Sequence, residues 1–275
     1  MQRRRLLGIG LAAAVLAATA ACDVQLNGEG GLSVGMAAGR AQDTWSRSYP
    51  LPKGGGRIEL INVNGRISAE PASGTSLELV AERTAKASSD DAAKELLGKV
   101  DMHEEAGASQ VRIEVRTPRH FGIGGVEVKW TVKVPRGAVV DLRNTNGKVL
   151  LEGLAGEVHA RTVNGGIEAR GISAQVVEAS TVNGGVDVQI AAPLADAGKV
   201  NLESVNGGVR LALPEGSKAS VVARVTNGGI DTGGLEFQTT GEKTRRRFEG
   251  TLNGGGASVK LETTNGGVRL SKSTT

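Results

Sequence analysis

One motif, Asn-Gly with a second Gly in most copies, recurs through the sequence and constrains the fold more than any other feature. Its asparagine stands at Asn64, Asn146, Asn164, Asn183, Asn206, Asn227 and Asn265. In every copy the residues six and four positions before the asparagine are apolar. The residues three and five positions after the asparagine are also apolar, except for Thr232. Alternation with a period of two predicts a strand on each side of the motif, with these positions buried.

The motif itself is predicted to be a turn rather than a ligand site. Before the asparagine, the inward-facing residues lie an even number of positions away, and after it they lie an odd number away. The turn must therefore accommodate a one-residue shift in the alternation of buried and exposed side chains. Asn and Gly adopt a positive φ at the least cost, which accounts for the first glycine of every copy. The seven asparagines are therefore structural candidates, and we expect their side chains to hydrogen-bond from one repeat to the next.

Two architectures fit this pattern. A hairpin would continue the pairing to the residue seven positions after the asparagine, which is apolar in two of the seven copies, at Ile190 and Leu213. A solenoid with one coil per repeat suits the intervals of 18, 19, 23 and 21 residues between Asn146 and Asn227. We therefore favour an all-β fold, a right-handed parallel β-solenoid or β-helix-like stack of about 20-residue rungs.

The flanking segments differ from the repeats. Alternation predicts strands over 75–83, 110–116 and 126–134, and Ser88 with Asp91 has the spacing of a capping box. A short helix should follow, with Ala92, Leu96 and Val100 on its apolar face. We expect residues 45–139 to form a first rung and a block that caps one end of the stack, because an open end exposes apolar strand edges. The repeat solenoid is predicted to cover residues 140–275, with the charged segment 242–247 looping off it.

The N-terminal segment is predicted to be a signal peptide over residues 1–21. Three arginines, Arg3 to Arg5, precede an apolar run of 16 residues that ends beside Cys22, the only cysteine. This run is shorter than the roughly 20 residues that span a bilayer as a helix. The segment resembles a bacterial lipoprotein signal, which implies an acylated Cys22. Ordinary secretion and an uncleaved anchor are the alternatives, and the arginines leave the Sec and twin-arginine export routes open. Residues 22–44 are predicted to be a flexible tether.

Charge excludes one class of partner. Residues 1–21 hold three arginines and no acid, so the rest of the chain has 30 Lys and Arg against 29 Asp and Glu. This balance gives no reason to expect a nucleic-acid partner. The one dense basic cluster consists of Lys243, Arg245, Arg246 and Arg247. It is either a solvated loop or a contact for anionic envelope polymers and lipid headgroups.

Catalytic and metal motifs are weak. The segment Gly31–Gly35 has the G-x-S-x-G pattern of serine hydrolases, but Ser33 lies in the expected tether rather than on a strand-turn-helix. His103 lacks the second histidine of a zinc helix. The outward position four after the asparagine mixes acidic, basic and apolar residues, which cannot form a calcium ladder. We predict no metal, no cofactor and no enzyme activity. A β-helix polysaccharide-active enzyme is the alternative, and six aromatic residues after the signal, mostly outside the repeats, make it the weaker one.

The segments "GGRIELINVNGRISAE" and "VKVPRGAVVDLRNTNGKVLLEGLAGEVHARTVNGGIEARG" resemble the bacterial putative-adhesin domain of unknown function, which has relatives among Lia-type cell-envelope stress proteins. The resemblance spans about residues 45–272. It implies a β-solenoid-like fold at the cell envelope and offers no catalytic residues. We therefore expect a lipid-anchored, extracytoplasmic protein with a structural, adhesin-like or envelope-interaction role. Its expected partners are the membrane, through the lipid, and an envelope protein or glycan. A binding module for anionic polysaccharide is the alternative.

Overall fold

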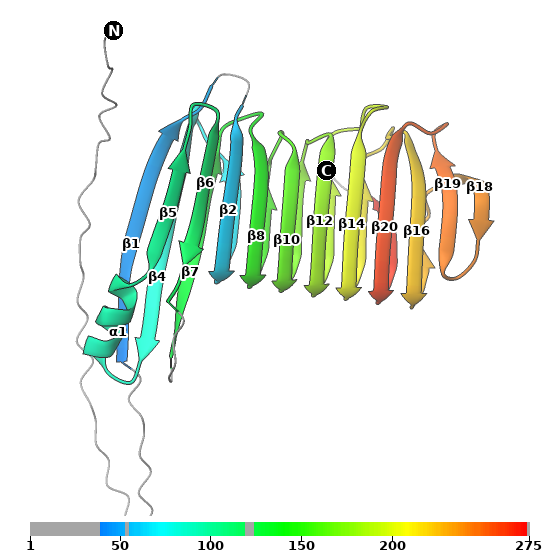
Figure 1. Ribbon diagram of the computed structural model, residues 1–275. Coiled ribbons are helices and arrows are strands. Elements are labelled where there is room, and N and C mark those ends of the chain that lie inside the picture. Colours follow the sequence, from blue (N-terminus) through cyan, green and yellow to red (C-terminus); the bar gives the residue numbers. More distant parts are fainter. Residues whose placement is uncertain (1–38, 53–54, 119–123, 274–275) are drawn as a thin grey trace, which may run out of the picture.

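The computed structural model describes residues 39–52, 55–118 and 124–273. Their strands form two sheets that face each other across one continuous apolar core (Figure 1). Sheet A has ten strands, in the order β1-β4-β7-β3-β9-β11-β13-β15-β21-β17. Sheet B has eleven, in the order β18-β19-β16-β20-β14-β12-β10-β8-β2-β6-β5. The predicted all-β, solenoid-like fold is confirmed.

Each repeat is one rung of the stack, with a strand in sheet B, the Asn-Gly motif and a strand in sheet A. The sheet B strands are β2 (Arg57–Asn64), β8 (Val139–Asn146), β10 (Val158–Asn164), β12 (Val176–Asn183), β14 (Lys199–Asn206), β16 (Ala219–Asn227) and β20 (Ala257–Asn265). The sheet A strands are β3 (Ile67–Pro71), β9 (Val149–Glu152), β11 (Ile167–Ile172), β13 (Val186–Ile190), β15 (Val209–Leu213), β17 (Ile230–Asp231) and β21 (Val268–Lys272). The motif is therefore a corner between two sheets, which explains the one-residue shift in the alternation and excludes the hairpin.

The rungs stack in parallel and in register, asparagine beside asparagine. Every predicted inward position before the asparagine is buried, and after it only Ile230 and Thr232 are partly exposed. Like side chains consequently form columns along the core, as in other solenoids. Burial of these columns is the main stabilising contribution that the repeat makes to the fold.

The order of the rungs in space differs from their order in the sequence. Strand β20 lies between β14 and β16, and β21 lies between β15 and β17. After β15 the chain leaves one rung position open, builds β16 and β17 beyond it, and returns to fill the position with its last rung. Figure 1 shows this as the red strand β20 inserted between the yellow strands β14 and β16. The sequence pattern did not predict this exchange.

A block of antiparallel strands and one helix extends the N-terminal end of the stack. Its elements are β1 (Gly39–Pro50), β4 (Ser76–Ala87), α1 (Asp90–Gly98), β5 (Asp101–Ala106), β6 (Gln110–Arg116) and β7 (Gly125–Val134). Strands β4, β6 and β7 cover the three segments predicted from alternation. Trp45 and Trp130 meet edge to face inside this block, with ring centroids 5.6 Å apart. The two rings fill the wider core between the sheets at this end.

Two details of this block correct the predictions. Ser89, not Ser88, caps the helix, because its Oγ accepts a hydrogen bond from Ala92 N at 3.2 Å. Leu96 is buried as predicted, together with Ala93 and Leu97, whereas Ala92 is only half-buried. Val100 is also buried, but it lies beyond the end of the helix. No helix among the described residues has the length and apolar character needed to cross a bilayer.

The second correction concerns the tether. Residues 39–44 were assigned to it, but they form the first half of β1, which pairs antiparallel with β4. An ion pair between Asp43 and Arg83 joins the two strands, and Ala41 and Trp45 pack against the core. A short alternating segment is stabilised here by a neighbouring strand that lies far away in the sequence. The remainder of the predicted tether, the signal segment, Ser33 and Cys22 lie outside the described residues.

The charged segment 242–247 was expected to loop off the stack, and the structure corrects this. It forms the tip of an antiparallel hairpin of β18 (Phe237–Lys243) and β19 (Arg247–Leu252), which continues sheet B beyond β16. Phe237 and Phe248 meet edge to face at 5.0 Å. The hairpin covers the free edge of β16, as a solenoid end requires.

Candidate functional site

The repeat asparagines form one continuous hydrogen-bonded ladder along the edge of the molecule. Each Nδ2 donates to the Oδ1 of the neighbouring asparagine, at 2.6–2.9 Å, in the spatial order Asn227, Asn265, Asn206, Asn183, Asn164, Asn146 and Asn64. The last amide donates to Val126 O at 3.3 Å. All six side-chain bonds point the same way, so each polarises the next and strengthens it.

A second polar column lies under the ladder, and the sequence analysis missed it. The residue two before the asparagine is buried in every rung, yet it is polar in all but Val225. Thr162, Thr181, Ser204 and Thr263 each donate a hydroxyl hydrogen bond of 2.7–3.2 Å to the first glycine carbonyl of an adjacent rung. These bonds satisfy buried carbonyls at the corner. The recurring small polar residue at this offset was the available signal.

The first glycine of each motif is required by close approach. A Cβ on Gly184 would lie 2.1 Å from the carbonyl oxygen of Gly165 in the next rung, and a Cβ on Gly207 would lie 1.9 Å from Gly184 O. No side chain fits there, because backbones of adjacent rungs touch. The asparagines themselves have no positive φ, since Asn253 is the one described non-glycine residue that does. The asparagine side chain forms the hydrogen-bonded ladder, and the glycine allows the backbones of adjacent rungs to approach each other closely.

The second glycine has no comparable requirement. Gly166, Gly185, Gly208 and Gly267 have no positive φ, and a Cβ on any of them would meet a neighbouring carbonyl oxygen at 3.3–3.4 Å. Arg66 and Lys148 occupy the same position in the first two rungs, so the corner accepts a side chain. The other five rungs nevertheless have glycine, and so no side chain, at this position.

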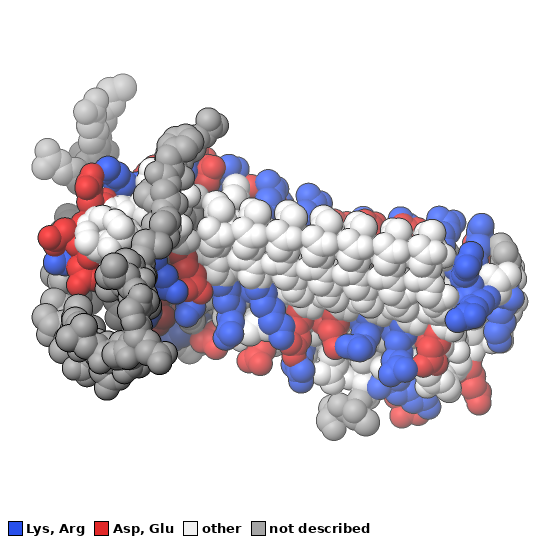
Figure 2. All heavy atoms as spheres, turned by 90° about the horizontal axis from the view of Figure 1, so that it is seen from below, with Lys and Arg blue, Asp and Glu red and all other residues white. Residues whose placement is uncertain are grey.

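The residue just before the asparagine points out to solvent and is uncharged in every rung. Val163, Val182 and Val205 are 42%, 40% and 41% exposed, and the other rungs carry Val or Thr. We define the asparagine edge as this residue, the asparagine and the two positions after it, over the rungs of Asn64 to Asn265. Arg66 and Lys148 are charged members of this edge, in its first two rungs. Elsewhere Figure 2 shows it as an uncharged strip along the stack, with charged side chains on both flanks.

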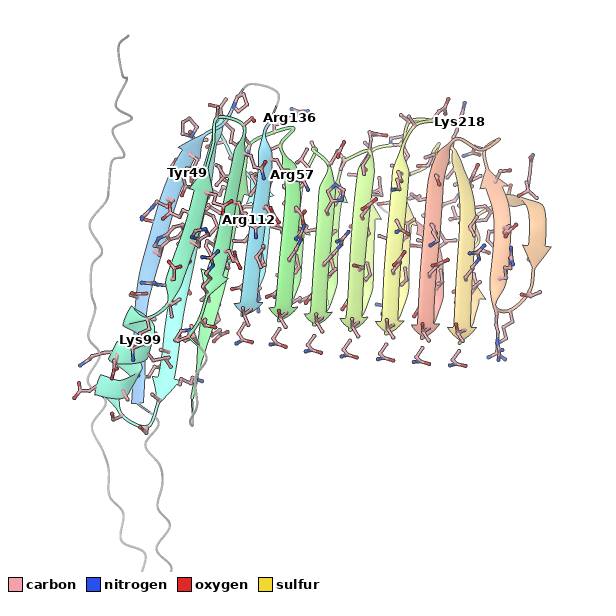
Figure 3. The ribbon with its side chains drawn as sticks, in the orientation of Figure 1. Tyr49, Arg57, Lys99, Arg112, Arg136 and Lys218 are labelled. Atoms are coloured by element: carbon pink, nitrogen blue, oxygen red, sulfur yellow. The ribbon has the colours of Figure 1, made fainter. Side chains whose placement is uncertain are left out.

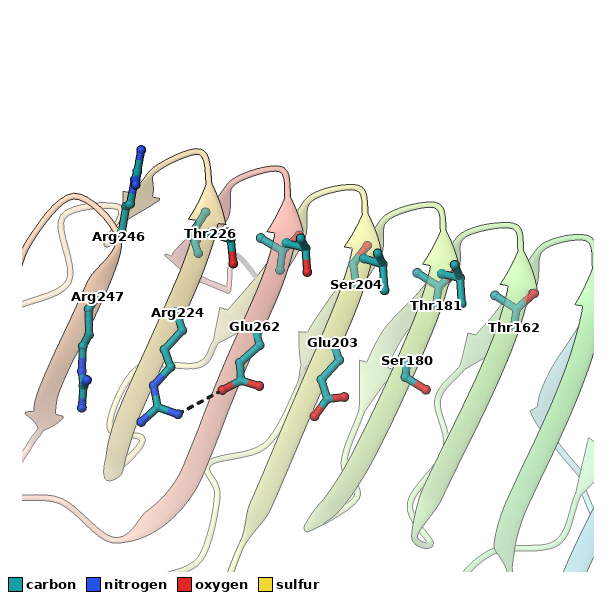
Figure 4. A pocket seen from close by; sticks show the side chains of 15 residues that line it. Thr162, Ser180, Thr181, Glu203, Ser204, Arg224, Thr226, Arg246, Arg247 and Glu262 are labelled. Atoms are coloured by element: carbon teal, nitrogen blue, oxygen red, sulfur yellow. Dashed lines mark hydrogen bonds and ion pairs between the residues drawn. The ribbon is translucent and has the colours of Figure 1, made fainter.

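A groove lies beside the asparagine edge on the outer face of sheet B. Its volume is about 670 Å³, and Ser180, Glu203, Arg224, Arg246 and Glu262 are among its lining residues (Figure 4). Its carboxylates are held by cations: Glu262 lies 2.8 Å from Lys260 Nζ and 3.4 Å from Arg224, and Glu203 lies 3.6 Å from Lys260. Each of these two carboxylates thus has a cationic partner on its own strand or a neighbouring one.

The predicted basic cluster is brought to the C-terminal end of the asparagine edge by the hairpin tip. The backbone carbonyls of Arg245 and Arg246 accept hydrogen bonds from Ile230 N and Val225 N, at 3.2 and 2.8 Å, which hold the tip against the last rung. Arg247 pairs with Glu249 at 2.7 Å. Lys243 lies in β18 and is exposed. Arg246 also lines the groove, where Figure 4 shows it pointing away from Arg247.

Other polar clusters lie on the outer face of sheet B. Glu178 of β12 contacts His159 at 3.2 Å and Lys199 at 2.6 Å on the two adjacent strands. The hydrogen bond from Lys199 is the largest effect on Glu178 and lowers its pKa; burial opposes it, and the hydrogen bond from His159 lowers the pKa further by a smaller amount. His103 contacts only Glu105, at 3.1 Å. Among the described residues, no group of three or more His, Cys, Asp or Glu is placed to hold a metal ion.

A denser network links three strands at the N-terminal end of sheet B. Glu59, 7% exposed, contacts Arg112 at 3.1 Å and Arg143 at 3.2 Å, while Asp141 contacts Arg57 and Arg143 at 3.0 Å. Figure 3 shows Arg57 and Arg112 on this side of the stack. Each carboxylate has basic partners on neighbouring strands, so the network joins the first rung to the capping block.

Residues 136–271 match the Toastrack family of domains of unknown function, DUF4097. The chain therefore carries a Toastrack domain. The resemblance predicted from the repeats is confirmed. A crystal structure of a putative cell adhesion protein from Clostridium sporogenes has a similar fold, with a TM-score of 0.51, 13% identity, and coverage of 84% of this chain and 100% of that one.

A putative adhesin from Bacteroides fragilis is 12% identical to the Toastrack chain over 82% of this chain and 96% of that one. Its TM-score of 0.37 is too low to support a structural argument. No functionally curated protein matches the sequence. These matches show the Toastrack domain and its fold, and none of them names a ligand.

Proposed function

We propose that this protein is an exported, lipid-anchored component of the cell envelope with a non-enzymatic, adhesin-like or structural role. The single observation that carries the proposal is the form of the Toastrack body, an elongated stack whose rungs expose one uniform edge (Figures 1 and 2). Such a body presents a long surface in place of a catalytic pocket. The name of the Clostridium sporogenes structure, a putative cell adhesion protein, supports the same role.

The path of the chain supports anchoring at one end. Gly39, the first described residue, begins β1, which is the outermost strand of sheet A at the N-terminal end of the stack. A lipid on Cys22 would attach this end of the body to the membrane and leave the asparagine edge accessible. Stable attachment takes more than one acyl chain, because a single chain binds reversibly.

Replacement of the cysteine tests the anchor. In the host, Cys22→Ser protein should accumulate as precursor or as soluble exported protein with its repeats folded. The measurement is membrane fractionation with a salt wash, followed by mass determination of the N-terminus. Ser33→Ala serves as the control, since it changes the same segment without removing the thiol. Fully processed Cys22→Ser protein that stays in the washed membranes would contradict the lipoprotein assignment.

A second candidate function is binding of an anionic envelope polymer, and the position of the basic cluster favours it. Arg245 and Arg246 are exposed at the end of the asparagine edge. The double change Arg245→Ala with Arg246→Ala should weaken binding of long-chain polyphosphate, and added salt should weaken it further. Arg136→Ala with Lys218→Ala is the matched control, because these cations lie at the opposite edge (Figure 3). Equal binding by the two double variants would rule out this candidate.

A further inference from the structure

The asparagine edge has free hydrogen-bonding capacity at regular spacing. A primary amide has two N–H donors and an oxygen with two lone pairs. Within the ladder, Asn164, Asn183 and Asn206 each use one N–H and one lone pair. Each of these exposed side chains therefore retains one donor and one acceptor for a ligand. Adjacent rungs repeat this pair about every 4.8 Å, the separation of hydrogen-bonded strands.

From the rung of Asn164 onward, the same edge is apolar beside the amides and free of charge. Val163, Val182 and Val205 form an exposed column next to the ladder. From the rung of Asn164 to the end of the stack, the second glycine replaces the cation found at Arg66 and Lys148. Neither φ nor contact distance demands glycine there. The bare position makes the edge flat, so a ligand can approach the amides and the valine methyl groups together.

The dimensions of the edge select the shape of its ligand. Seven rungs span about 29 Å, and the four residues across, three intervals apart, give a width of about 10 Å, or roughly 300 Å². A stable dimer of this chain would need roughly 800 Å² per partner, which the edge does not offer. A long, narrow strip fits a single extended polymer. A peptide repeats its side chains on one face about every 6.6 Å and so drifts out of step with the rungs.

We propose that the asparagine edge binds a neutral linear polysaccharide in an extended conformation. Its hydroxyl groups bond to the free amide N–H and C=O of successive asparagines, while the C–H faces of its sugar rings pack on the valine column. One extended sugar unit is comparable in length with one rung, so several units bind in step. The basic cluster adjoins only the C-terminal end of this site, where Arg246 and Val205 line the same groove. The site does not depend on the lipid anchor.

Binding of defined oligosaccharides tests the proposal. The full-length chain, purified in detergent, is titrated calorimetrically with cellohexaose and N-acetylchitohexaose. Maltohexaose, a neutral glycan that coils, and polygalacturonate, an extended anionic one, are the comparison probes. We expect at least one of the two extended neutral probes to bind, about tenfold more tightly than its disaccharide because several rungs engage at once.

Two variants place a cation on the edge without disturbing the core. Val182→Lys changes a 40% exposed side chain, and Gly185→Lys reproduces the residue that Lys148 already provides at the equivalent position. Either should weaken binding at least about tenfold, since the cation must be desolvated beneath the sugar. Val80→Lys is the matched control, because Val80 is 38% exposed on β4, away from the edge. Melting temperatures verify that all three variants fold.

Three results would contradict the assignment of the asparagine edge to a neutral glycan. If neither extended neutral probe binds, the proposal is wrong. If Val80→Lys weakens binding as much as Val182→Lys, the ligand lies elsewhere. Preferred binding of polygalacturonate that disappears in the Arg245→Ala, Arg246→Ala variant would assign the surface to anionic polymers and overturn the neutral-glycan assignment. Membrane fractionation of Cys22→Ser remains an independent result in every case.

Discussion

At the scale of single residues, the two glycines of the motif do different things although they are adjacent. The first lets the backbones of neighbouring rungs touch, and the second leaves the exposed corner bare. Asparagine at the position before them contributes a side-chain ladder rather than an unusual backbone conformation. The fold therefore requires the first glycine and the asparagine, whereas the second glycine is explained by what the edge presents to a ligand.

Alanine at the two glycines should separate these roles. A Cβ at Gly184 would lie 2.1 Å from Gly165 O, while a Cβ at Gly185 would lie 3.3 Å from Gly208 O. Gly184→Ala must force two rungs apart, so we expect a loss of more than about 3 kcal/mol in the free energy of unfolding. Gly185→Ala should cost less than about 1 kcal/mol. Urea denaturation measures both. Equal losses would show that close packing does not explain the first glycine.

The ladder can be tested at one amide. Asn183 donates to Asn164 and accepts from Asn206, both at 2.8–2.9 Å. Asn183→Ala should lower the free energy of unfolding by about 1–2 kcal/mol, because two hydrogen bonds are lost and water satisfies the exposed partners only in part. Asn201→Ala, on the outer face of the same sheet, bonds only to Glu203 and should cost less than about 0.5 kcal/mol. If the two variants are equally stable, the ladder contributes nothing beyond ordinary surface hydrogen bonds.

At the scale of elements, apolar columns predicted the strands well because burial on one face imposes a period of two. What they could not predict is which rungs become neighbours. The rungs of Asn206, Asn227 and Asn265 have interchangeable inward columns, so any two of them can pair in register. One difference marks the rung of Asn227: its residue at the buried polar position is Val225, so this rung lacks the hydroxyl with which Ser204 and Thr263 bond the neighbouring rung.

Antiparallel pairing explains the other errors. Residues 39–44 form a strand only because β4 lies beside them, and the segment 242–247 is a hairpin tip only because β16 presents a free edge. Neither partner is visible in a local pattern. For the candidate site, the sequence predicted which residues belong to it but not how they are arranged in space. The turn asparagines and the basic cluster follow from the sequence, but their alignment along one edge depends on parallel stacking in register.

The cross-strand contacts of Glu178 make a prediction about pH. Lys199 and His159 lower the pKa of this carboxyl in the folded protein, so its contribution to stability is complete above its unfolded pKa, about 4.3. That contribution is lost as the pH falls through the folded pKa. Glu178→Gln should therefore be less stable than wild type at pH 6, and the gap should close as the pH falls below about 4. Urea midpoints across this range measure it, with Glu152→Gln, an exposed carboxylate on β9, as the control. A gap that is constant with pH would exclude the ion pairs as its cause.

At the scale of the whole molecule, the inserted rung closes the stack. Strand β20 pairs with both β14 and β16, and β21 with both β15 and β17. The rung of β20 and β21 therefore links the rung of β16 and β17, with the β18–β19 hairpin beyond it, to the rest of the stack. In an array of nearest-neighbour contacts, removing an internal rung separates everything beyond it from the remainder. A terminal rung would have no such effect.

Truncation distinguishes these cases. A chain that ends at Asn253 lacks β20 and β21, so β16 and β17 lose their parallel partners and the hairpin is paired only with β16. The sheet B strands from β2 to β12 keep both of their neighbours. Hydrogen exchange should show loss of protection throughout Ala219–Leu252 and retained protection in β8, β10 and β12, because exchange reports local opening. A chain that ends at Ser273, which keeps the bond from Ser273 N to Leu213 O at 2.7 Å, is the control. Retained protection of β16 in the shorter chain would mean that β16 can dock directly on β14, and that the last rung is an addition to the stack rather than its closure.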